Sequence, residues 1–326
     1  MIGRAPLKRR TVIAGFGSSV AAWPATAAAQ PGPHVAYLDG ASVPQWFEAF
    51  RNGLRDLGYI ENQTLVIDRY VTAGRSQDLA QLAQEIVRLR PQAIAVSGSR
   101  PSLALKAATT TIPIIVIFAT DPVGMGLVDS LARPGGNVTG LSNMGGGLMA
   151  KRLQLLLEII PNATSVGVIW APVNREVEFD FREIRSAAMA MGLQLESFEV
   201  TAAEEYDAAF EKAAARVKCV AVLSGPLAFA NRAIIVAAAG RHKVPAIYYD
   251  LEYAVSGGLI SYGPSLAGLH RQAAKYVARV LKGEKPAELP VEEPANFELV
   301  LNLKSAKALG LMLPPAILAR ADQVIE

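Results

Sequence analysis

Two short polar loops hold the residues that are best suited to binding a small charged solute. Residues 97–99 (Ser-Gly-Ser) follow the apolar run 93–96, and Asp121 and Pro122 follow the β-branched run 112–118. Hydroxyl groups and free N–H groups at the start of a helix suit a carboxylate, and the Asp121 carboxylate suits an ammonium group. The alternatives are structural, since the serines could serve only as a helix cap and Asp121 only as a turn residue before Pro122.

The elements around these loops indicate that both lie at one edge of a parallel sheet. The runs 93–96 and 112–118 are almost wholly apolar, which is typical of parallel strands covered on both faces. The carboxyl ends of such strands form the edge at which open α/β sheets bind ligands. The same alternation of strands and helices recurs along the chain, with helices predicted over residues 44–57, 124–132, 148–160, 228–241 and 314–326.

The alternation restarts after the glycine-rich stretch 145–147, which predicts two doubly wound, Rossmann-like α/β lobes. We expect residues 33–143 and 253–285 in the first lobe and residues 147–250 in the second. Residues 295–326 are assigned to the second lobe, with the first lobe as the alternative. Several strands would then cross between the lobes and form a hinge over a cleft. A single eight-stranded barrel is the structural alternative, which the glycine-rich break and the long C-terminal tail fit poorly.

The first 29 residues have the pattern of a cleavable signal peptide. Residues 1–10 carry four basic residues and no acid, residues 11–22 are small and apolar, and residues 27–29 provide an A-x-A cleavage site. This segment is too short and too weakly apolar to span a membrane. Residues 8–13 also resemble a twin-arginine export signal, and an ordinary Sec signal is the alternative. With either signal, and with no cysteine near residue 30 to carry a lipid, we expect a freely soluble periplasmic protein.

Charge and residue content argue against several classes of function. The chain has 32 Lys and Arg against 29 Asp and Glu, and four of the basic residues belong to the signal. The mature protein is therefore close to neutral, without a basic run that would indicate nucleic-acid binding. The single cysteine, Cys219, lies in a buried-strand pattern and is interpreted as a core residue. His34, His242 and His270 are scattered without ligand-spaced partners, so neither a metal nor another cofactor is expected.

A series of segments carries a resemblance to a known family. They are residues 106–114, 121–123, 133–140, 151–153, 257–265, 281–286 and 302–310. In this order they resemble the periplasmic solute-binding proteins of ABC transporters, type I, and more narrowly the subfamily grouped with tryptophan-type uptake binding proteins. Segments 171–174 and 225–229 depart from the family pattern at positions expected in the cleft, so the choice of ligand stays open.

The resemblance implies a monomeric periplasmic protein that captures a small solute between its lobes and delivers it to a membrane permease without chemistry. An amino acid or related carboxylate is the leading ligand class; a short peptide, an aromatic acid or another small metabolite is the alternative. Candidates for ligand binding are the residues that follow predicted strands. In the first lobe these are Ser42, Ser97, Gly98, Ser99, Asp121 and Pro122. The second-lobe candidates are Asn174, Phe229, Tyr249 and Glu252.

Alternatives remain for the function and for single residues. A soluble ligand-binding sensor that acts on a separate membrane receptor would use the same fold. An enzyme is less favoured, because G-x-S-x-G, P-loop and H-E-x-x-H motifs are missing. A glycosidase would need two carboxylates in the cleft, and Asp121 with Glu252 is the pair that we can propose. Phe229 and Tyr249 could equally be core residues, and Asn174 could be a turn residue.

Overall fold

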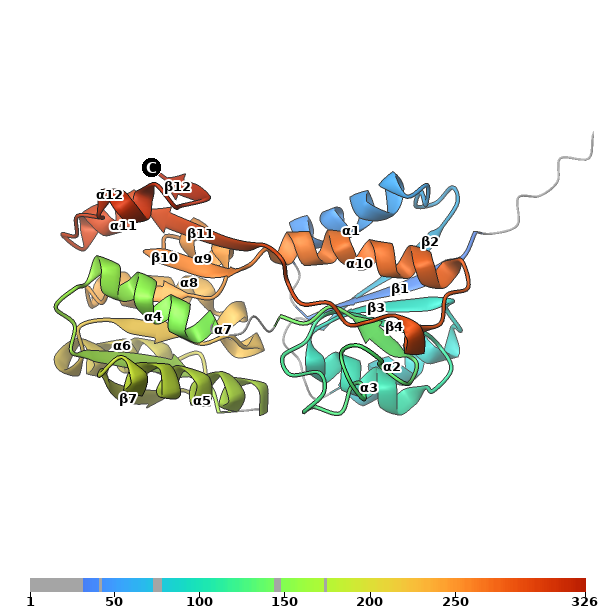
Figure 1. Ribbon diagram of the computed structural model, residues 1–326, viewed down its shortest axis with the longest axis horizontal. Helices are drawn as coiled ribbons and strands as arrows, with labels where there is room; N and C mark the ends of the chain where they lie inside the picture. The colour runs from blue at the N-terminus through green and yellow to red at the C-terminus, as the bar shows by residue number, and fades with distance from the viewer. Residues whose placement is uncertain (1–31, 41–42, 73–77, 144–147, 173–174) are drawn as a thin grey trace, which may run out of the picture. The chain divides into compact units, whose positions relative to one another are not determined.

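Two separate sheets organise the chain in the computed structural model, which describes residues 32–40, 43–72, 78–143, 148–172 and 175–326 (Figure 1). Among these described residues, one sheet has five strands and the other has seven. Within the described ranges, no helix is both long enough and apolar enough to cross a membrane. The predicted pair of doubly wound α/β lobes is confirmed, and the barrel alternative is wrong because the strands form two sheets.

The first sheet is wholly parallel and has the strand order β2-β1-β3-β4-β5. Its strands are β1 (His34–Asp39), β2 (Val66–Val71), β3 (Ala93–Ser97), β4 (Ile114–Phe118) and β5 (Val138–Gly140). Helices α2 (Leu79–Arg88) and α3 (Ser99–Ala108) lie on one face, and α1 (Pro44–Asp56) and α10 (Leu266–Leu281) lie on the other (Figure 1). Both faces are therefore covered, which explains the nearly unbroken apolar composition of β3 and β4.

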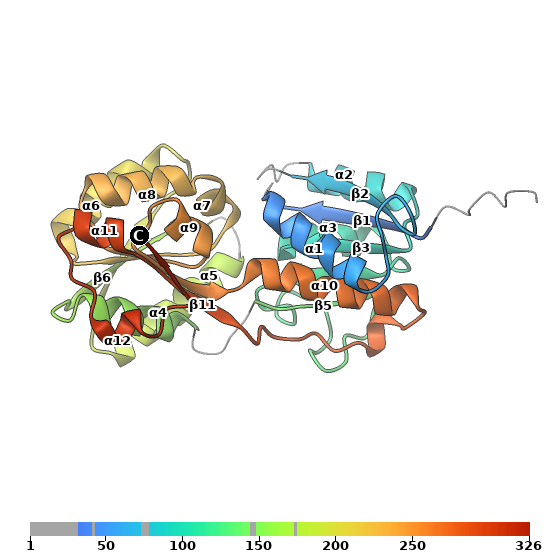
Figure 2. The same ribbon diagram turned by 90° about the horizontal axis from the view of Figure 1, so that it is seen from above.

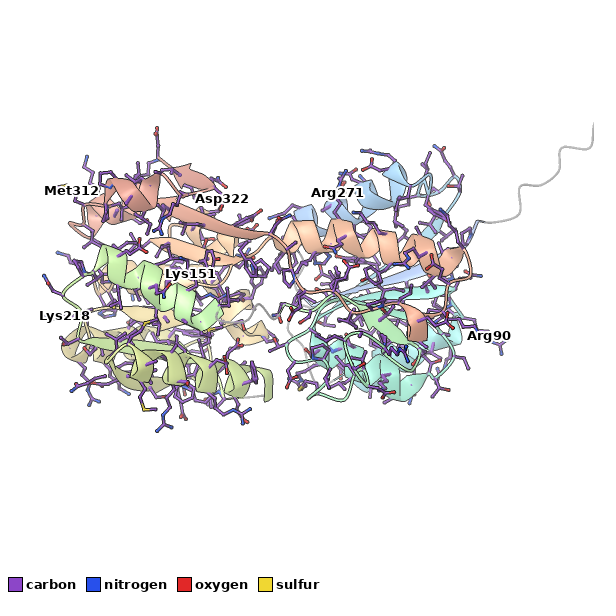
Figure 3. The ribbon with its side chains drawn as sticks, in the orientation of Figure 1. Arg90, Lys151, Lys218, Arg271, Met312 and Asp322 are labelled. Atoms are coloured by element: carbon purple, nitrogen blue, oxygen red, sulfur yellow. The ribbon has the colours of Figure 1, made fainter. Side chains whose placement is uncertain are left out.

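Helix α1 forms because its sequence has a residue suited to a helix N-terminus and a row of apolar residues on one face. Pro44 occupies the first turn, where a missing N–H costs nothing, and Trp46, Phe47, Phe50 and Leu54 share the buried face. This face packs against α10, which is formed by residues 266–281. An ion pair between Asp56 of α1 and Arg271 of α10 adds a contact at the surface. Arg271 is labelled in Figure 3.

The second sheet has the strand order β12-β11-β10-β9-β8-β6-β7. Its strands are β6 (Ser165–Trp170), β7 (Gln194–Glu199), β8 (Val220–Val222), β9 (Ala246–Tyr248), β10 (Ile260–Pro264), β11 (Phe297–Asn302) and β12 (Gln323–Ile325). The pairing of β10 with β11 is antiparallel and the others are parallel. Its helices are α4 (Leu148–Ile159), α5 (Arg175–Ala190), α6 (Glu205–Arg216), α7 (Pro226–Ala230), α8 (Arg232–Arg241), α9 (Leu251–Val255), α11 (Leu303–Ala308) and α12 (Pro315–Leu318).

The helices of the second sheet also divide between its two faces. Figure 2 shows α6 and α8 on one side of the strands and α4 and α12 on the other. The buried side chains agree with this division, because α6 and α8 contribute to one apolar cluster and α4 and α5 to another. Cys219 is fully buried in the second of these clusters, as predicted.

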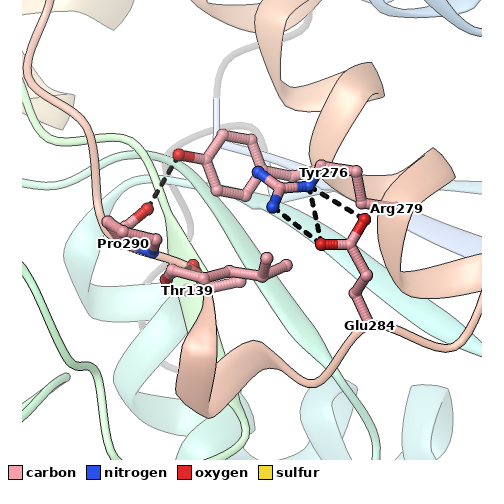
Figure 4. Close-up of polar contacts among 6 residues, drawn as sticks. Thr139, Tyr276, Arg279, Glu284 and Pro290 are labelled. Atoms are coloured by element: carbon pink, nitrogen blue, oxygen red, sulfur yellow. Dashed lines mark hydrogen bonds and ion pairs between the residues drawn. The ribbon is translucent and has the colours of Figure 1, made fainter.

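The chain passes between the two sheets three times, after β5, after β10 and before β11. The last passage includes the 3-10 helix η1 (Pro286–Glu288) and is held to β5 of the first sheet and to α10 by polar contacts (Figure 4). Thr139 Oγ1 donates to the Leu289 carbonyl at 2.6 Å, and the Tyr276 hydroxyl donates to the Pro290 carbonyl at 2.8 Å. These contacts fix the point from which the chain returns to the second sheet.

The strand pairing favours a boundary between the lobes later in the chain than the expected residue 253. Strand β10 is hydrogen-bonded to β9 and β11, and α9 packs on β10 and β11. Residues 253–264 therefore belong with the second sheet, and α10 is the segment that returns to the first. We propose residue 265 as the boundary, with the C-terminal strands β11 and β12 in the second lobe.

Three predicted helices differ from the structure. Residues 124–132 form turns because Gly126 has φ +72° and the Pro122 carbonyl accepts bonds from two successive N–H groups. The expected helix at 228–241 is divided into α7 and α8 at Asn231. The expected closing helix at 314–326 is limited to α12 and is followed by β12, because Asp322 bonds to the backbone of Leu299 in β11.

Candidate functional site

A cavity of about 400 Å³ lies at the carboxyl ends of strands from both sheets. It is lined from the first sheet by the segments after β1, β3 and β4, and from the second sheet by α4, α5 and the segments after β8 and β9. Its volume falls within the range of roughly 300–1,000 Å³ that small-molecule sites occupy. The position at strand ends is the one predicted from the sequence for ligand binding.

The β3–α3 loop brings the predicted residues Ser97, Gly98 and Ser99 to this cavity. Gly98 has φ +92° and ψ 155°, a conformation that is essentially restricted to glycine. The Ser99 hydroxyl accepts a hydrogen bond from the Thr120 N–H at 3.2 Å and so joins the ends of β3 and β4. The first turn of α3 presents N–H groups that have no acceptor within the helix, which suits an anion.

Among the described residues that line the cavity, three polar side-chain atoms are buried without a hydrogen-bond partner. They are Ser97 Oγ, in a residue that is 3% exposed, Asn143 Oδ1 and Arg232 Nε. A buried polar atom that makes no bond costs free energy, so an unpaired atom of this kind in a lined cavity indicates a place for a ligand group. Ser97 therefore fits the carboxylate-binding role better than the role of a helix cap.

Aromatic side chains from both sheets form the apolar wall of the cavity. Trp46 of α1 and Phe229 of α7 face each other with ring centroids 5.0 Å apart, and both are buried. Tyr249, which follows β9, lies 6.4 Å from Phe229 between ring centroids. The guanidinium of Arg232 lies over the Phe229 ring and donates to the Phe229 carbonyl at 3.2 Å. The predicted residues Phe229 and Tyr249 thus both line the cavity and also pack into the surrounding core.

The cavity also contains two buried charged residues that the sequence patterns did not predict. Arg152 of α4 is 4% exposed, and its Nε donates to the Tyr262 carbonyl at 2.7 Å. Asp180 of α5 is 8% exposed and accepts a 2.6 Å hydrogen bond from the Ser224 hydroxyl. Burial lowers the pKa of Arg152 to about 10 and raises the pKa of Asp180, while the Ser224 bond and the Arg152 charge oppose the shift at Asp180.

Asp121, Pro122 and Glu252 do not line the cavity. Asp121 has φ +44° and its Oδ1 accepts a hydrogen bond from the Gly124 N–H at 2.9 Å, so its placement matches the turn-forming alternative. Glu252 accepts a hydrogen bond from the Gln45 side chain. That these three residues contact the ligand stays a prediction, which the lining of the cavity does not support. The same holds for Asp121 and Glu252 as a catalytic pair.

The predicted residues Ser42 and Asn174 lie outside the described residues. The sequence pattern does not indicate Arg152 and Asp180, because both lie inside helices and the predicted site residues follow strands. Segment 151–153 carried a signal, since it was one of the segments that resemble the family. No comparable signal distinguishes Asp180 from the other acidic residues of its helix.

The two lobes and the cavity at their strand ends define a protein of the type I periplasmic binding fold. Solved structures of similar proteins have the same fold. The chain belongs to the family of ABC transporter substrate binding proteins, whose model matches residues 35–325. This confirms the family expected from the resemblance. The family is one of solute-binding proteins, and its match extends over nearly all of the described chain.

Individual relatives share much of the chain at moderate identity. The Tyrosine-binding protein of Clostridioides difficile is 26% identical over 276 residues, which are 84% of this chain and 79% of the relative. The structure of an ABC domain in complex with L-Trp from Streptococcus pneumonia is 26% identical, with a TM-score of 0.84, and covers 90% of this chain and 100% of that one. A conserved domain protein from Vibrio cholerae is 29% identical, with a TM-score of 0.84, over 90% of this chain and 99% of that one.

Proposed function

We propose that this protein is the solute-binding component of an ABC importer and that its solute is an α-amino acid with an aromatic side chain. The observation that carries the proposal is the composition of the cavity. It combines a buried carboxylate on Asp180, a buried guanidinium on Arg152 and aromatic walls around Trp46 and Phe229. Two relatives are described with tyrosine or with bound L-Trp, which supports the same ligand class.

An amino acid would use both kinds of lining. Its ring would replace water against Trp46 and Phe229, and its charged groups would meet buried polar groups of the cavity. Since the walls come from both sheets, a bound ligand would favour the arrangement in which the two sheets approach each other. The protein would hold and release the solute unchanged, and a membrane permease of the same transporter would receive it.

We also propose that residues 1–29 are a signal peptide and that the mature protein acts as a monomer in the periplasm. The basic, apolar and A-x-A segments in the leader support export. The near-neutral charge of the mature chain is consistent with a protein that recognises a small solute and not a nucleic acid.

A thermal-shift screen of the purified protein tests the ligand class. A ligand that binds only the folded state at a hundredfold excess over Kd stabilises it by about 2.7 kcal/mol. We expect L-tryptophan, L-tyrosine or L-phenylalanine to raise the melting temperature, and sugars and aromatic amines without a carboxylate to leave it unchanged. A response to a sugar or a short peptide alone, with folded protein, would contradict the proposed ligand class.

A further inference from the structure

Asp180 is the one buried carboxylate among the described residues that line the cavity. Glu183 also lines it but is exposed to solvent. Asp250 is buried yet does not line the cavity, and its Oδ1 accepts the bond that caps α9, from the Glu252 N–H at 2.9 Å. Asp121 serves its own turn through the Gly124 N–H. A cationic ligand group that enters this cavity therefore has Asp180 as its desolvated anionic partner.

The described contacts of Asp180 leave one of its two carboxylate oxygens for a ligand. Ser224 donates to Oδ2 at 2.6 Å, and in the described part of the chain no hydrogen bond is made to Oδ1. A buried carboxylate normally has several hydrogen bonds or a paired cation, because its removal from water is costly. One hydrogen bond is a small compensation for a side chain that is 8% exposed.

Arg152 is close enough to influence Asp180 but does not pair with it. The Arg152 charge favours the ionised form of Asp180, whereas the described ion pairs do not include these two residues. The hydrogen bonds of Arg152 go instead to the Tyr262 carbonyl at 2.7 Å and to the Met149 sulfur at 3.5 Å. Arg152 therefore acts on Asp180 through its charge and leaves the carboxylate free to bind another cation. Lys151, the preceding residue on α4, marks this helix in Figure 3.

We infer that Asp180 is the residue that accepts the ammonium group of the ligand, with Ser224 orienting its carboxylate. This inference rests on the proposed function and names the residue that makes a free amino group a requirement. The opposite end of the cavity presents Ser97 Oγ and the first turn of α3, which suit the ligand carboxylate. An amino acid would thus place its two charges against the two different sheets.

The experiment combines the substitution Asp180→Asn with ligands that lack the amino group. Titration calorimetry would compare L-tryptophan with 3-indolepropionate, and L-tyrosine with 3-(4-hydroxyphenyl)propionate, on the wild type and on the variant. Removing the carboxylate charge should weaken binding of the amino acid about 30-fold or more. It should change the affinity for the des-amino acid by less than about threefold, because that ligand has no ammonium group to lose.

Asp207→Asn is the matched control, because it is the same substitution in a residue of α6, in the same lobe as Asp180, that does not line the cavity; this variant should bind the amino acid as the wild type does. Equal losses for both ligands in Asp180→Asn, or no loss for the amino acid, would overturn the inference. If the wild type binds neither amino acid, the proposed function fails and the inference fails with it. Should Asp180→Asn not fold, Ser224→Ala carries the test, since it keeps the charge and must weaken binding of the amino acid alone.

Discussion

Replacing Trp46 by alanine is expected to lower the free energy of unfolding by about 3–5 kcal/mol, because a nearly fully buried indole is lost. Trp46 is 3% exposed, contacts Phe229 at 5.0 Å between ring centroids and stacks on His270 at 5.4 Å. It also forms part of the cavity wall, so binding of the aromatic ligand should weaken at least about tenfold. Denaturant unfolding and ligand titration of the same variant measure the two effects.

Trp170→Ala is the matched control for this prediction. Trp170 is 7% exposed and stacks on Phe181, but it does not line the cavity. Its removal should cost a similar amount of stability and leave the affinity for the ligand unchanged. An equal loss of affinity in both variants would mean that the effect of Trp46→Ala is a general consequence of lower stability and not of its place in the wall.

Replacing Gly140 by alanine is expected to destabilise the first lobe by roughly 3 kcal/mol or more. Gly140 has φ +134°, and a Cβ at this position would overlap the carbonyl oxygen of Val116 on the neighbouring strand β4. Backbone atoms cannot move aside as a flexible side chain can, so the pairing of β4 with β5 would have to shift. Denaturant unfolding monitored by circular dichroism measures the loss.

Gly136→Ala is the corresponding control, in the turn that leads into β5. A Cβ on Gly136 would meet no heavy atom within 4 Å, and Gly136 does not have a positive φ. Its substitution should change the free energy of unfolding by less than about 0.5 kcal/mol. Similar stability of the two variants would show that β5 tolerates a side chain and that the strand pairing is looser than described.

Most of the fold could be predicted from the sequence because its strands are covered on both faces. Strands β3 and β4 are short apolar runs, and α1 has a helical stripe from Trp46 to Leu54, so each element has one obvious assignment. The errors arose where tertiary contacts decide the conformation. The tail after Pro314 has helical composition, but Asp322 pairs with Leu299 and continues the sheet as β12.

The site was only partly predictable, because strand ends supply only some of its residues. The residues after β3, β8 and β9 were found in this way, and Ser97, Phe229 and Tyr249 line the cavity. Arg152 and Asp180 come from α4 and α5, and only the packing of these helices against the second sheet brings their charges to the cavity. The turn at Asp121 illustrates the opposite error, since a carboxylate after a strand can be used by the backbone of its own loop.

A crystal structure of the protein with the amino acid that gives the largest thermal shift tests the central claim most directly. We predict that the ligand lies in the cavity with its ring against the wall formed by Trp46 and Phe229 and its ammonium group within hydrogen-bond distance of Asp180. A ligand bound at another surface, or a cavity that stays empty while the ligand is shown by calorimetry to bind, would contradict the assignment of this cavity as the solute site.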